Sequence, residues 1–481
     1  MTQLPNRPDD TDETNVALAA EIVSLREENS ALKELIKNFQ ARIAELERRL
    51  ELNSSNSSKP PSSDGPKKPP RTISLRMQSG KSRGGQKGHP GATLQPVATP
   101  DAVVDHYPEA CNRCSAKPHA DTSTGYSARQ VFDLPEPQPM CITEHRAHAC
   151  TCAQCGAVTA ASFPAGVGAP VQYGPRISAI VLYLLHGHFL PEDRLAEVMR
   201  DLFNVCLVPA TIARMSRSCA DRLAGFVDAV RAAVCGAKVK HQDETGFRLG
   251  GKTQWLHIAS TTLLTFYRVC AKRGSLLADV VGITVHDHWK PYYTMQNVLH
   301  ALCNAHHLRE LKALVELDQE DWARKMQILL RRACHVTNLA RELGVDLKPR
   351  LIARIERRYE VIMAEGFAFH EALPALRRAQ RRGTKPHRIG HNLLMRLRER
   401  RSDVLRFIHD LDVPFTNNQG ERDARMMKLR QKISGGFRAD ASAADFAAIR
   451  SALSTAKKQG WNILHALMQD AQALIGSLKT V

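Results

Sequence analysis

The chain has 481 residues, in which 67 Lys and Arg outweigh 49 Asp and Glu and give a formal net charge of +18. This length predicts two to four domains, and the excess positive charge favours a polyanionic partner, most commonly nucleic acid. The first 14 residues are acidic and polar, unlike a signal peptide, and we expect them to be disordered. The most apolar run, 177–190, contains His186 and His188 and is too short and too polar to cross a membrane. We therefore expect a cytoplasmic protein, associated with the nucleoid when bound, with no membrane partner.

Residues 15–52 carry a heptad repeat of apolar side chains and predict a leucine-zipper coiled coil. The d positions hold Leu18, Leu25, Leu32, Phe39 and Leu46, and the a positions hold Ile22, Asn29, Ile36, Ile43 and Leu50. Ile at a with Leu at d favours a parallel dimer, and a single Asn at an a position fixes register and partner number. The alternative is one amphipathic helix packed on its own domain, but the strict seven-residue period favours self-association.

Residues 53–104 are rich in Ser, Pro and Gly and predict a linker without a core. Between residues 67 and 89 the linker has seven Lys and Arg and no acidic residue, and Lys81, Arg83 and Lys87 lie in its Gly-rich half. A flexible basic strip suits phosphate backbones or the minor groove of DNA. The alternative is a solvated linker with no ligand.

Two C-x-x-C pairs in residues 105–165 predict a zinc-ribbon-like module. Without an export signal, the 12 cysteines are unlike a disulfide framework, and regular spacing favours a metal site. The expected ligands of one structural Zn²⁺ are Cys111, Cys114, Cys152 and Cys155. The 37-residue gap between the pairs is long, and Cys141, Cys150, His145 and His148 are alternative ligands. The alternative without metal is four reduced cysteines. The segment 126–148 between the pairs is strand-like.

Residues 170–236 have a helical pattern and contain a possible helix-turn-helix. Pro209 is suited to the first turn of its second helix, which also carries Thr211, Arg214 and Arg217. The turn has no Gly, so an ordinary helical hairpin is an equally good interpretation.

From residue 237 the pattern changes to strands. Three β-rich runs in residues 237–270 are followed by a short predicted helix at 274–282, a fourth strand at 282–289 and a fifth from 298. Asp243 and Asp287 lie where the first and fourth strand-like runs end. This order is that of a ribonuclease-H-like α/β domain, in which the first and fourth strands are neighbours. We therefore expect Asp243 and Asp287 to meet although 44 residues separate them.

The rest of the chain is predicted to be helical. We expect residues 237–304 to form the first part of the ribonuclease-H-like domain, 305–412 a basic helical insertion, 413–440 the helix that carries Glu421, and 441–481 C-terminal helices. The overall fold is therefore multidomain α+β. In the insertion, His306 and His307 could face the acids or the DNA, and a structural role is an equally good interpretation.

Each of the three acids has a structural explanation of its own. Asp243 could cap a strand, Asp287 could pair with a neighbouring histidine, and Glu421 forms a capping-box-like pair with Asn418 and an i,i+4 pair with Arg425. Together, in this topological order, they are better explained as one site. Three carboxylates are suited to gripping two Mg²⁺ or Mn²⁺ ions for phosphodiester chemistry.

Basic residues cluster twice near the end of the insertion. Ten Lys and Arg stand against one acid in residues 377–401, and more follow Glu421. Such one-sided charge predicts contact with phosphates. The candidates are Arg377, Arg378, Arg381, Arg382, Arg422, Arg425, Lys428 and Arg430.

The chain resembles the insertion-sequence-66 family of bacterial transposases along nearly its whole length, in order. The matching words are NSSNSSKPPSSD near residue 53, RGGQKGHPG near 83, both C-x-x-C pairs, DET at 243–245, D-x-W-x-P-Y-Y from Asp287, LCNAHHLREL from 302 and TNNQGERDAR-x-x-K-x-R-x-K-x-SGGFR from 416. This resemblance implies a DDE-type transposase in which Asp243, Asp287 and Glu421 are the catalytic metal ligands, with Asp279 as the alternative second acid.

The resemblance also implies partners. These are the element ends and target DNA, a second copy of the chain or a higher oligomer, and small accessory proteins of the same element. Two alternative functions remain open for this chain. One is a non-catalytic DNA-binding regulator descended from a transposase, and the other is a nuclease that cuts DNA without joining it.

Overall fold

The computed structural model describes residues 10–53, 56–57, 95–133, 140–374 and 387–480. The chain divides into two compact units, one formed by residues 1–73, 173–191 and 210–481, and the other by residues 74–172 and 192–209. In the part of the chain that the structure describes, no helix is long and apolar enough to cross a membrane.

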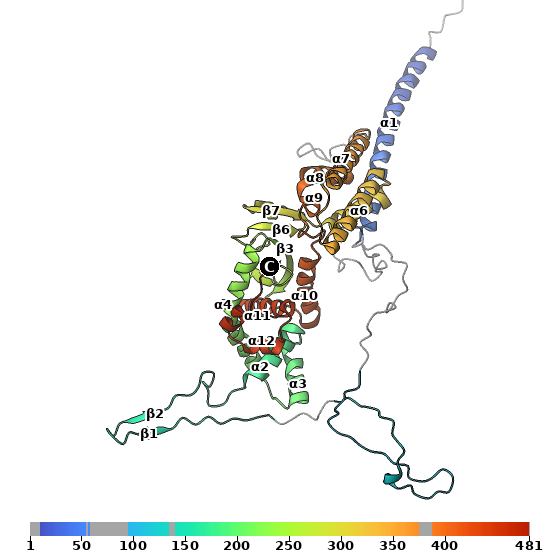
Figure 1. The fold of residues 1–481 in the computed structure, drawn as a ribbon. Helices are drawn as coiled ribbons and strands as arrows, with labels where there is room; N and C mark the ends of the chain where they lie inside the picture. Colours follow the sequence, from blue (N-terminus) through green and yellow to red (C-terminus); the bar gives the residue numbers. More distant parts are fainter. Residues whose placement is uncertain (1–9, 54–55, 58–94, 134–139, 375–386, 481) are drawn as a thin grey trace, which may run out of the picture. The chain divides into compact units, whose positions relative to one another are not determined.

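The larger unit is built on a mixed sheet of five strands in the order β5-β4-β3-β6-β7 (Figure 1). Its strands are β3 (Val239–Leu249), β4 (Lys252–Ser260), β5 (Thr265–Cys270), β6 (Gly282–His286) and β7 (Val298–Leu302). β3, β4 and β5 pair antiparallel, whereas β3, β6 and β7 pair parallel. The predicted adjacency of the first and fourth strands is therefore confirmed.

Two local predictions in this sheet are wrong. The predicted helix at 274–282 is instead an irregular loop over residues 274–281, followed by Gly282 at the start of β6. Its end turns through positive φ angles at Asp279 (60°) and Gly282 (77°), and a Cβ at Gly282 would lie 2.7 Å from the carbonyl oxygen of Lys238. Asp243 is also not at a strand end, because β3 stays paired with β4 through Leu249 after its pairing with β6 stops.

One group of helices covers the β4–β5 side of the sheet. These are α2 (Pro175–Leu182), the π-helical turn η3 (Tyr183–Gly187), α4 (Pro209–Gly236), α11 (Asp440–Gln459), α12 (Ile463–Met468) and α13 (Ala471–Gly476). Leu223 and Phe226 of α4 and Leu453 of α11 pack with Ala259 and Phe266 of the sheet in one apolar cluster. The predicted C-terminal helices are therefore confirmed.

The predicted helical insertion is also confirmed. Its elements are α5 (Asn304–Leu317), α6 (Asp321–Leu343), α7 (Pro349–Glu371), α8 (Ile389–Glu399) and α9 (Arg401–His409). They share an apolar cluster with β6 and β7, in which Val285 and Leu302 pack with Leu311, Met326 and Phe407. The insertion is thus an extension of the core and not a separate appendage (Figure 1).

The helix α10 (Asn418–Ser434) lies against β3 and β4 through a third apolar cluster, which includes Met427, Phe247 and Leu256. The segment after this helix returns to β3, where Phe437 bridges Leu249. The backbone N–H of Phe437 donates to the carbonyl of Arg248 at 3.2 Å. Packing therefore fixes the helix along its length.

The long helix α1 (Asp10–Glu51) confirms that the heptad segment is helical. It begins five residues before residue 15, so the prediction of disorder for residues 1–14 is wrong from Asp10 onward, and residues 1–9 lie outside the described part. The heptad side chains are exposed, among them Leu18 (53%) and Phe39 (59%), and Asn29 is exposed as well. Near the end of the helix, Arg48 pairs with Asp318 at 2.6 Å. The coiled coil itself stays a prediction.

The smaller unit contains the 3₁₀ turn η2 (Ala120–Thr122), the strands β1 (Ala149–Thr151) and β2 (Val158–Ala160), and the helix α3 (Glu192–Phe203). β1 and β2 pair antiparallel around the second cysteine pair. The described residues of the strand-like segment 126–148 form no strand, so the predicted position of the strands is wrong. None of the described residues in 95–172 is buried, because this stretch has too few apolar side chains in contact to form a core.

The predicted helix-turn-helix corresponds to α3 and α4, which belong to different units. α4 is a core helix of the larger unit and has ten buried residues. This extent of burial is typical of a helix that packs in a core. In its first turns, Arg217 pairs with Asp445 at 3.1 Å, while Arg214 is exposed. A DNA-reading role for Thr211, Arg214 and Arg217 stays a prediction.

Candidate active site

Asp243 and Asp287 lie in register on two neighbouring parallel strands. His241 of β3 is opposite Val285 of β6, so each acid lies two residues beyond this last pair. Asp243 continues along β3, and Asp287 is the first residue after β6. The backbone N–H of Trp289 donates to Asp287 Oδ1 at 3.0 Å. The strand register therefore puts the two acids at the same level of neighbouring strands, and the charge of Asp287 contributes to the raised pKa of Asp243.

Glu421 approaches from the first turn of α10, and Asn417 fixes the start of this helix. Asn417 Nδ2 donates to the carbonyl of Gln242 at 2.8 Å, and its Oδ1 lies 2.8 Å from His241 Nδ1. A Cβ at Gly420 would lie 2.9 Å from Asn417 Oδ1, so glycine leaves room for this side chain. The predicted capping box between Asn418 and Glu421 is wrong, because Asn417 is the N-cap residue and its side chain bonds to β3.

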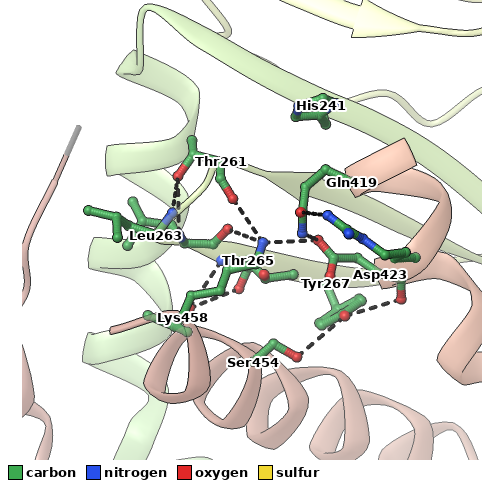
Figure 2. A network of polar contacts seen from close by, with 12 residues as sticks. His241, Thr261, Leu263, Thr265, Tyr267, Gln419, Asp423, Ser454 and Lys458 are labelled. Carbon is green, nitrogen blue, oxygen red and sulfur yellow. Dashed lines mark hydrogen bonds and ion pairs between the residues drawn. The ribbon is translucent and has the colours of Figure 1, made fainter. Parts of the chain in front are cut away.

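A buried ion pair holds α10 against the sheet and α11 (Figure 2). Lys458 Nζ lies 3.0 Å from Asp423 Oδ2, and both side chains are largely buried, with 14% and 13% exposed. Lys458 also donates to the carbonyls of Thr261 at 2.9 Å and Leu264 at 3.0 Å. Gln419 Nε2 donates to Asp423 Oδ2 at 2.9 Å. These bonds orient the turn of α10 that carries Glu421.

The carboxyl groups influence one another strongly. Burial, followed by the negative charges of Glu244 and Asp287, raises the pKa of Asp243 well above its usual value, and Glu421 adds to the effect. Burial and the charge of Glu244 also raise the pKa of Asp287, while His306 opposes this increase. Clustered, buried carboxylates gain stability from a bound cation. The electrostatics of the cluster are therefore compatible with a bound cation.

Glu244 is a fourth carboxylate, whose role the sequence analysis missed. Its side chain is almost fully buried, accepts a hydrogen bond from Tyr292 at 2.6 Å and pairs with Arg273 at 2.6 Å. The Arg273 guanidinium also stacks on the rings of Trp255 and Trp289, at 5.1 and 4.3 Å. Glu244 and Tyr292 both lie in sequence motifs that match the family, DET and D-x-W-x-P-Y-Y. These motifs could have indicated a role for both residues.

Next to Asp287 is a pocket with several histidines. It is lined by Asp287, His288, Trp289, Leu302, Cys303, His306, His307, Glu310 and Arg396. Burial raises the pKa of the Cys303 thiol to about 12. His307 has a structural role, since its Nδ1 lies 3.1 Å from Asn304 Oδ1 inside the protein. His306 instead lies close to Glu421, at 4.0 Å.

The predicted DNA-binding residues fall into three groups. Lys81, Arg83, Lys87, Arg377, Arg378, Arg381 and Arg382 lie outside the described residues. Arg422 and Arg425 are exposed on α10 beside the site, and Arg425 forms its predicted pair with Glu421 at 3.3 Å. Lys428 donates to the carbonyl of Gly246 at 2.7 Å, and the guanidinium of Arg430 lies 3.5 Å from the Phe437 ring centroid. Lys428 and Arg430 therefore also stabilise the fold.

Several other arginines of the basic stretch have structural roles. Arg396 pairs with Glu310, Arg401 pairs with Glu360 at 2.6 Å, and the Arg400 guanidinium stacks on Tyr293 at 3.6 Å. Fewer arginines in residues 377–401 are therefore free to contact phosphates than the excess of positive charge suggests.

The two cysteine pairs form matching turns. The backbone N–H of Cys111 donates to Ala116 and that of Cys152 donates to Ala157, both at 2.8 Å. Hydrogen bonds from backbone N–H groups of their own turns lower the pKa values of the Cys111 and Cys152 thiols. Among the described residues, no three of the four predicted ligand sulfurs lie within 4.8 Å of one another. Zinc binding by Cys111, Cys114, Cys152 and Cys155 therefore stays a prediction.

Comparison with known families identifies the class of the larger unit. The sequence model described as "Transposase IS66 family" matches residues 170–445, which is more than half of the chain. The chain therefore belongs to the IS66 family of transposases, and its function is related to transposition. Residues 5–95 match a family of unknown function. No curated protein matches the chain.

Proposed function

We propose that this protein is a DDE-type transposase that cuts DNA and joins element ends to a target by metal-dependent phosphodiester chemistry. The observation that carries the proposal is the register of β3 and β6, which puts Asp243 beside Asp287. The anchored first turn of α10 adds Glu421. The strand order is that of a ribonuclease-H-like domain, and family membership favours this chemistry.

The acids fit hard divalent ions. Carboxylate oxygens are the ligands that Mg²⁺ and Mn²⁺ prefer. Burial and the neighbouring carboxylates raise the pKa of Asp243, and a bound cation would offset both effects. The three carboxylates do not fall within 4.8 Å of one another. They would therefore be shared between two ions and not gathered around one. Asp243, Asp287 and Glu421 would hold both ions.

Bound ions of this kind activate the attacking hydroxyl and stabilise the leaving oxygen in an in-line displacement. The protein orients the ligands. Glu244 fixes Arg273 and Tyr292 next to Asp243, and Asn417 and Asp423 fix the helix that carries Glu421. Arg422 and Arg425, exposed beside the acids, would hold the scissile strand through its phosphates.

Other parts of the chain would assemble and dock the complex. The exposed apolar stripe of α1 suits a parallel coiled coil with a second copy. The cysteine turns suit one structural Zn²⁺. The partners would be element-end and target DNA, with small accessory proteins of the element, in the bacterial cytoplasm.

The test is mobilisation of a marked mini-element in cells, comparing wild type with Asp243→Asn at matched protein levels. Asp279→Asn is the control, because Asp279 lies in the loop before β6 and is the alternative second acid. We expect movement with wild type and Asp279→Asn, and none with Asp243→Asn.

A gel-shift assay with element ends separates loss of chemistry from loss of DNA binding. Binding by every variant with movement by none would support a regulator, and cleavage of purified DNA without joining would support a plain nuclease. Equal movement by wild type and Asp243→Asn would overturn the catalytic assignment.

A further inference from the structure

Beside the acids lies a chemically different group of metal-ligand atoms. Cys303, His306 and Glu421 each offer one ligand atom within 4.8 Å of the other two. Cys303 Sγ and His306 Nδ1 are each 4.0 Å from Glu421 Oε1. Within the described ranges, this is the one group of three such atoms. A thiol, an imidazole and a carboxylate are typical ligands of Zn²⁺, whereas Mg²⁺ takes oxygen alone.

Local structure places the three side chains together. Cys303 is the N-cap residue of α5, and His306 follows three residues later, so both side chains lie on one side of the first turn. Glu421 comes from the first turn of α10. The two helix N-termini therefore meet at the group, where their positive ends favour the carboxylate, and also the thiolate that a bound metal ion would create from the buried thiol.

The group is held by backbone contacts before any ligand binds. The backbone N–H of Asn417 donates to Cys303 Sγ at 3.1 Å, which joins the starts of α5 and α10. The N–H of Asn304 donates to the carbonyl of Phe415 at 3.1 Å and strengthens this junction. His306 Nδ1 is buried and has no hydrogen-bond partner among the described residues. A buried nitrogen of this kind gains a partner when it binds a metal.

Space and a further ligand are available. Cys303 and His306 line the same pocket as Asp287, whose carboxylate also interacts electrostatically with His306. Tetrahedral zinc ligands at about 2.0–2.3 Å from the ion lie roughly 3.4–3.8 Å from one another. The two 4.0 Å separations to Glu421 would need to shorten by a few tenths of an ångström, and the Cys303–His306 separation, which is at most 4.8 Å, by no more than about 1.4 Å. Asp287 or a water molecule would occupy the fourth position.

We propose that Cys303, His306 and Glu421 form a binding site for Zn²⁺ or a chemically similar ion, separate from the cysteine turns. The ion's two positive charges would balance the thiolate and the carboxylate. Because Glu421 serves both sites, zinc bound here withdraws it from the hard-ion site and inhibits catalysis. Binding of the ion does not depend on the proposed function, whereas inhibition of catalysis by the ion rests on it.

The test is titration of the full chain with Co²⁺, followed by the optical absorption of Co²⁺–thiolate coordination. The cysteine turns also contribute to this signal, so the quantity measured is the difference between variants. Cys303→Ser is expected to remove one Co²⁺ equivalent. Cys334→Ser, which removes a half-buried cysteine in α6, is expected to remove none.

His306→Gln provides a second variant whose side chain retains a polar group, and helical circular dichroism with a thermal melt verifies that each variant is folded. Loss of the same equivalent in folded His306→Gln supports the site. Full stoichiometry in folded Cys303→Ser or His306→Gln overturns it. This readout needs no catalysis, so it is independent of the proposed function.

The regulatory part has its own measurement. Zinc added to Mg²⁺-dependent nicking should inhibit wild type and Cys334→Ser alike, and about ten-fold more zinc should be needed for Cys303→Ser. Equal zinc sensitivity in wild type, Cys334→Ser and Cys303→Ser would overturn the proposal that the two metal sites compete for Glu421. The result of the Co²⁺ titration would not be affected. Absence of nicking in wild type would count against the proposed function and not against the metal site.

Discussion

The acid site and the cysteine module of residues 105–165 are both predicted to bind metal, but they are built in opposite ways. Around Asp243, Asp287 and Glu421, apolar clusters and the buried Lys458–Asp423 pair set the positions of the elements. The described residues of the cysteine module include none that is buried, and its strands have three residues each. Packing between distant segments positions the residues of the acid site, whereas only local turns position the cysteines of the module.

This difference indicates what each metal would do. In the larger unit the ion would add function to a scaffold that folds by burial of apolar side chains. In the cysteine module the ion would replace the missing core, as structural zinc does in small domains. The same contrast predicts how each region responds to metal removal and to mutation.

The largest effect is expected in the cysteine module. Because structural zinc contributes about 10–16 kcal/mol to the folding of such sites, Cys152→Ser or a chelator should unfold residues 105–165. Hydrogen exchange would show loss of protection there and unchanged protection in β3–β7. Cys150→Ser is the matched control in the same hairpin. Unfolding by this control as well would mean that the ligand set is different.

The next effect concerns the ion pair that anchors α10. Asp423→Ala leaves Lys458 largely buried without its partner, which should cost about 3–5 kcal/mol in the free energy of unfolding. Denaturant titration measures this cost. Arg425→Ala breaks the other ion pair of the same helix, in which Arg425 is 68% exposed, and should cost at most about 1 kcal/mol. Equal costs for the two variants would contradict the anchoring role.

The third effect is a dependence on pH. Because the folded-state pKa of Asp243 is raised, the folded chain binds this proton more tightly than the unfolded chain. Without divalent ions, stability should therefore fall as pH rises from about 4 through the raised pKa. Thermal melts at several pH values test this, and Asp243→Asn should flatten the curve. At pH 8, Mg²⁺ at 100 times its dissociation constant should restore about 2.7 kcal/mol in wild type.

The smallest effect concerns DNA. Arg422→Gln with Arg425→Gln should leave the fold intact and reduce the salt dependence of DNA binding, because each lost phosphate contact lowers the slope by about 0.9. Fluorescence anisotropy at several salt concentrations measures this slope. An unchanged slope would remove both residues from the proposed DNA surface.

The sequence predicted the parts of the site that depend on topology. The order of the elements predicted that the first and fourth strands are neighbours and that a later helix carries Glu421. The structure confirms both predictions. The position of Asp243 within β3 was missed, because the alternation of residue types weakens at Glu244 although the pairing with β4 continues. Contacts between distant segments, such as Asp423 with Lys458 and Asn417 with Cys303, leave no local pattern.

The dependence of the acid site on α10 and Lys458 also matters during synthesis. Asp243 leaves the ribosome about 180 residues before Glu421, and Lys458 follows later still. At about 5–20 residues per second this delay is roughly 10–35 s. Once Asp287 has also left the ribosome, the nascent chain has two of the acids but lacks the third until Glu421 follows. Under the proposed function, a chain that completes its acid site last would be unable to cut DNA while it is being made, and chains that end before Glu421 would lack the third acid.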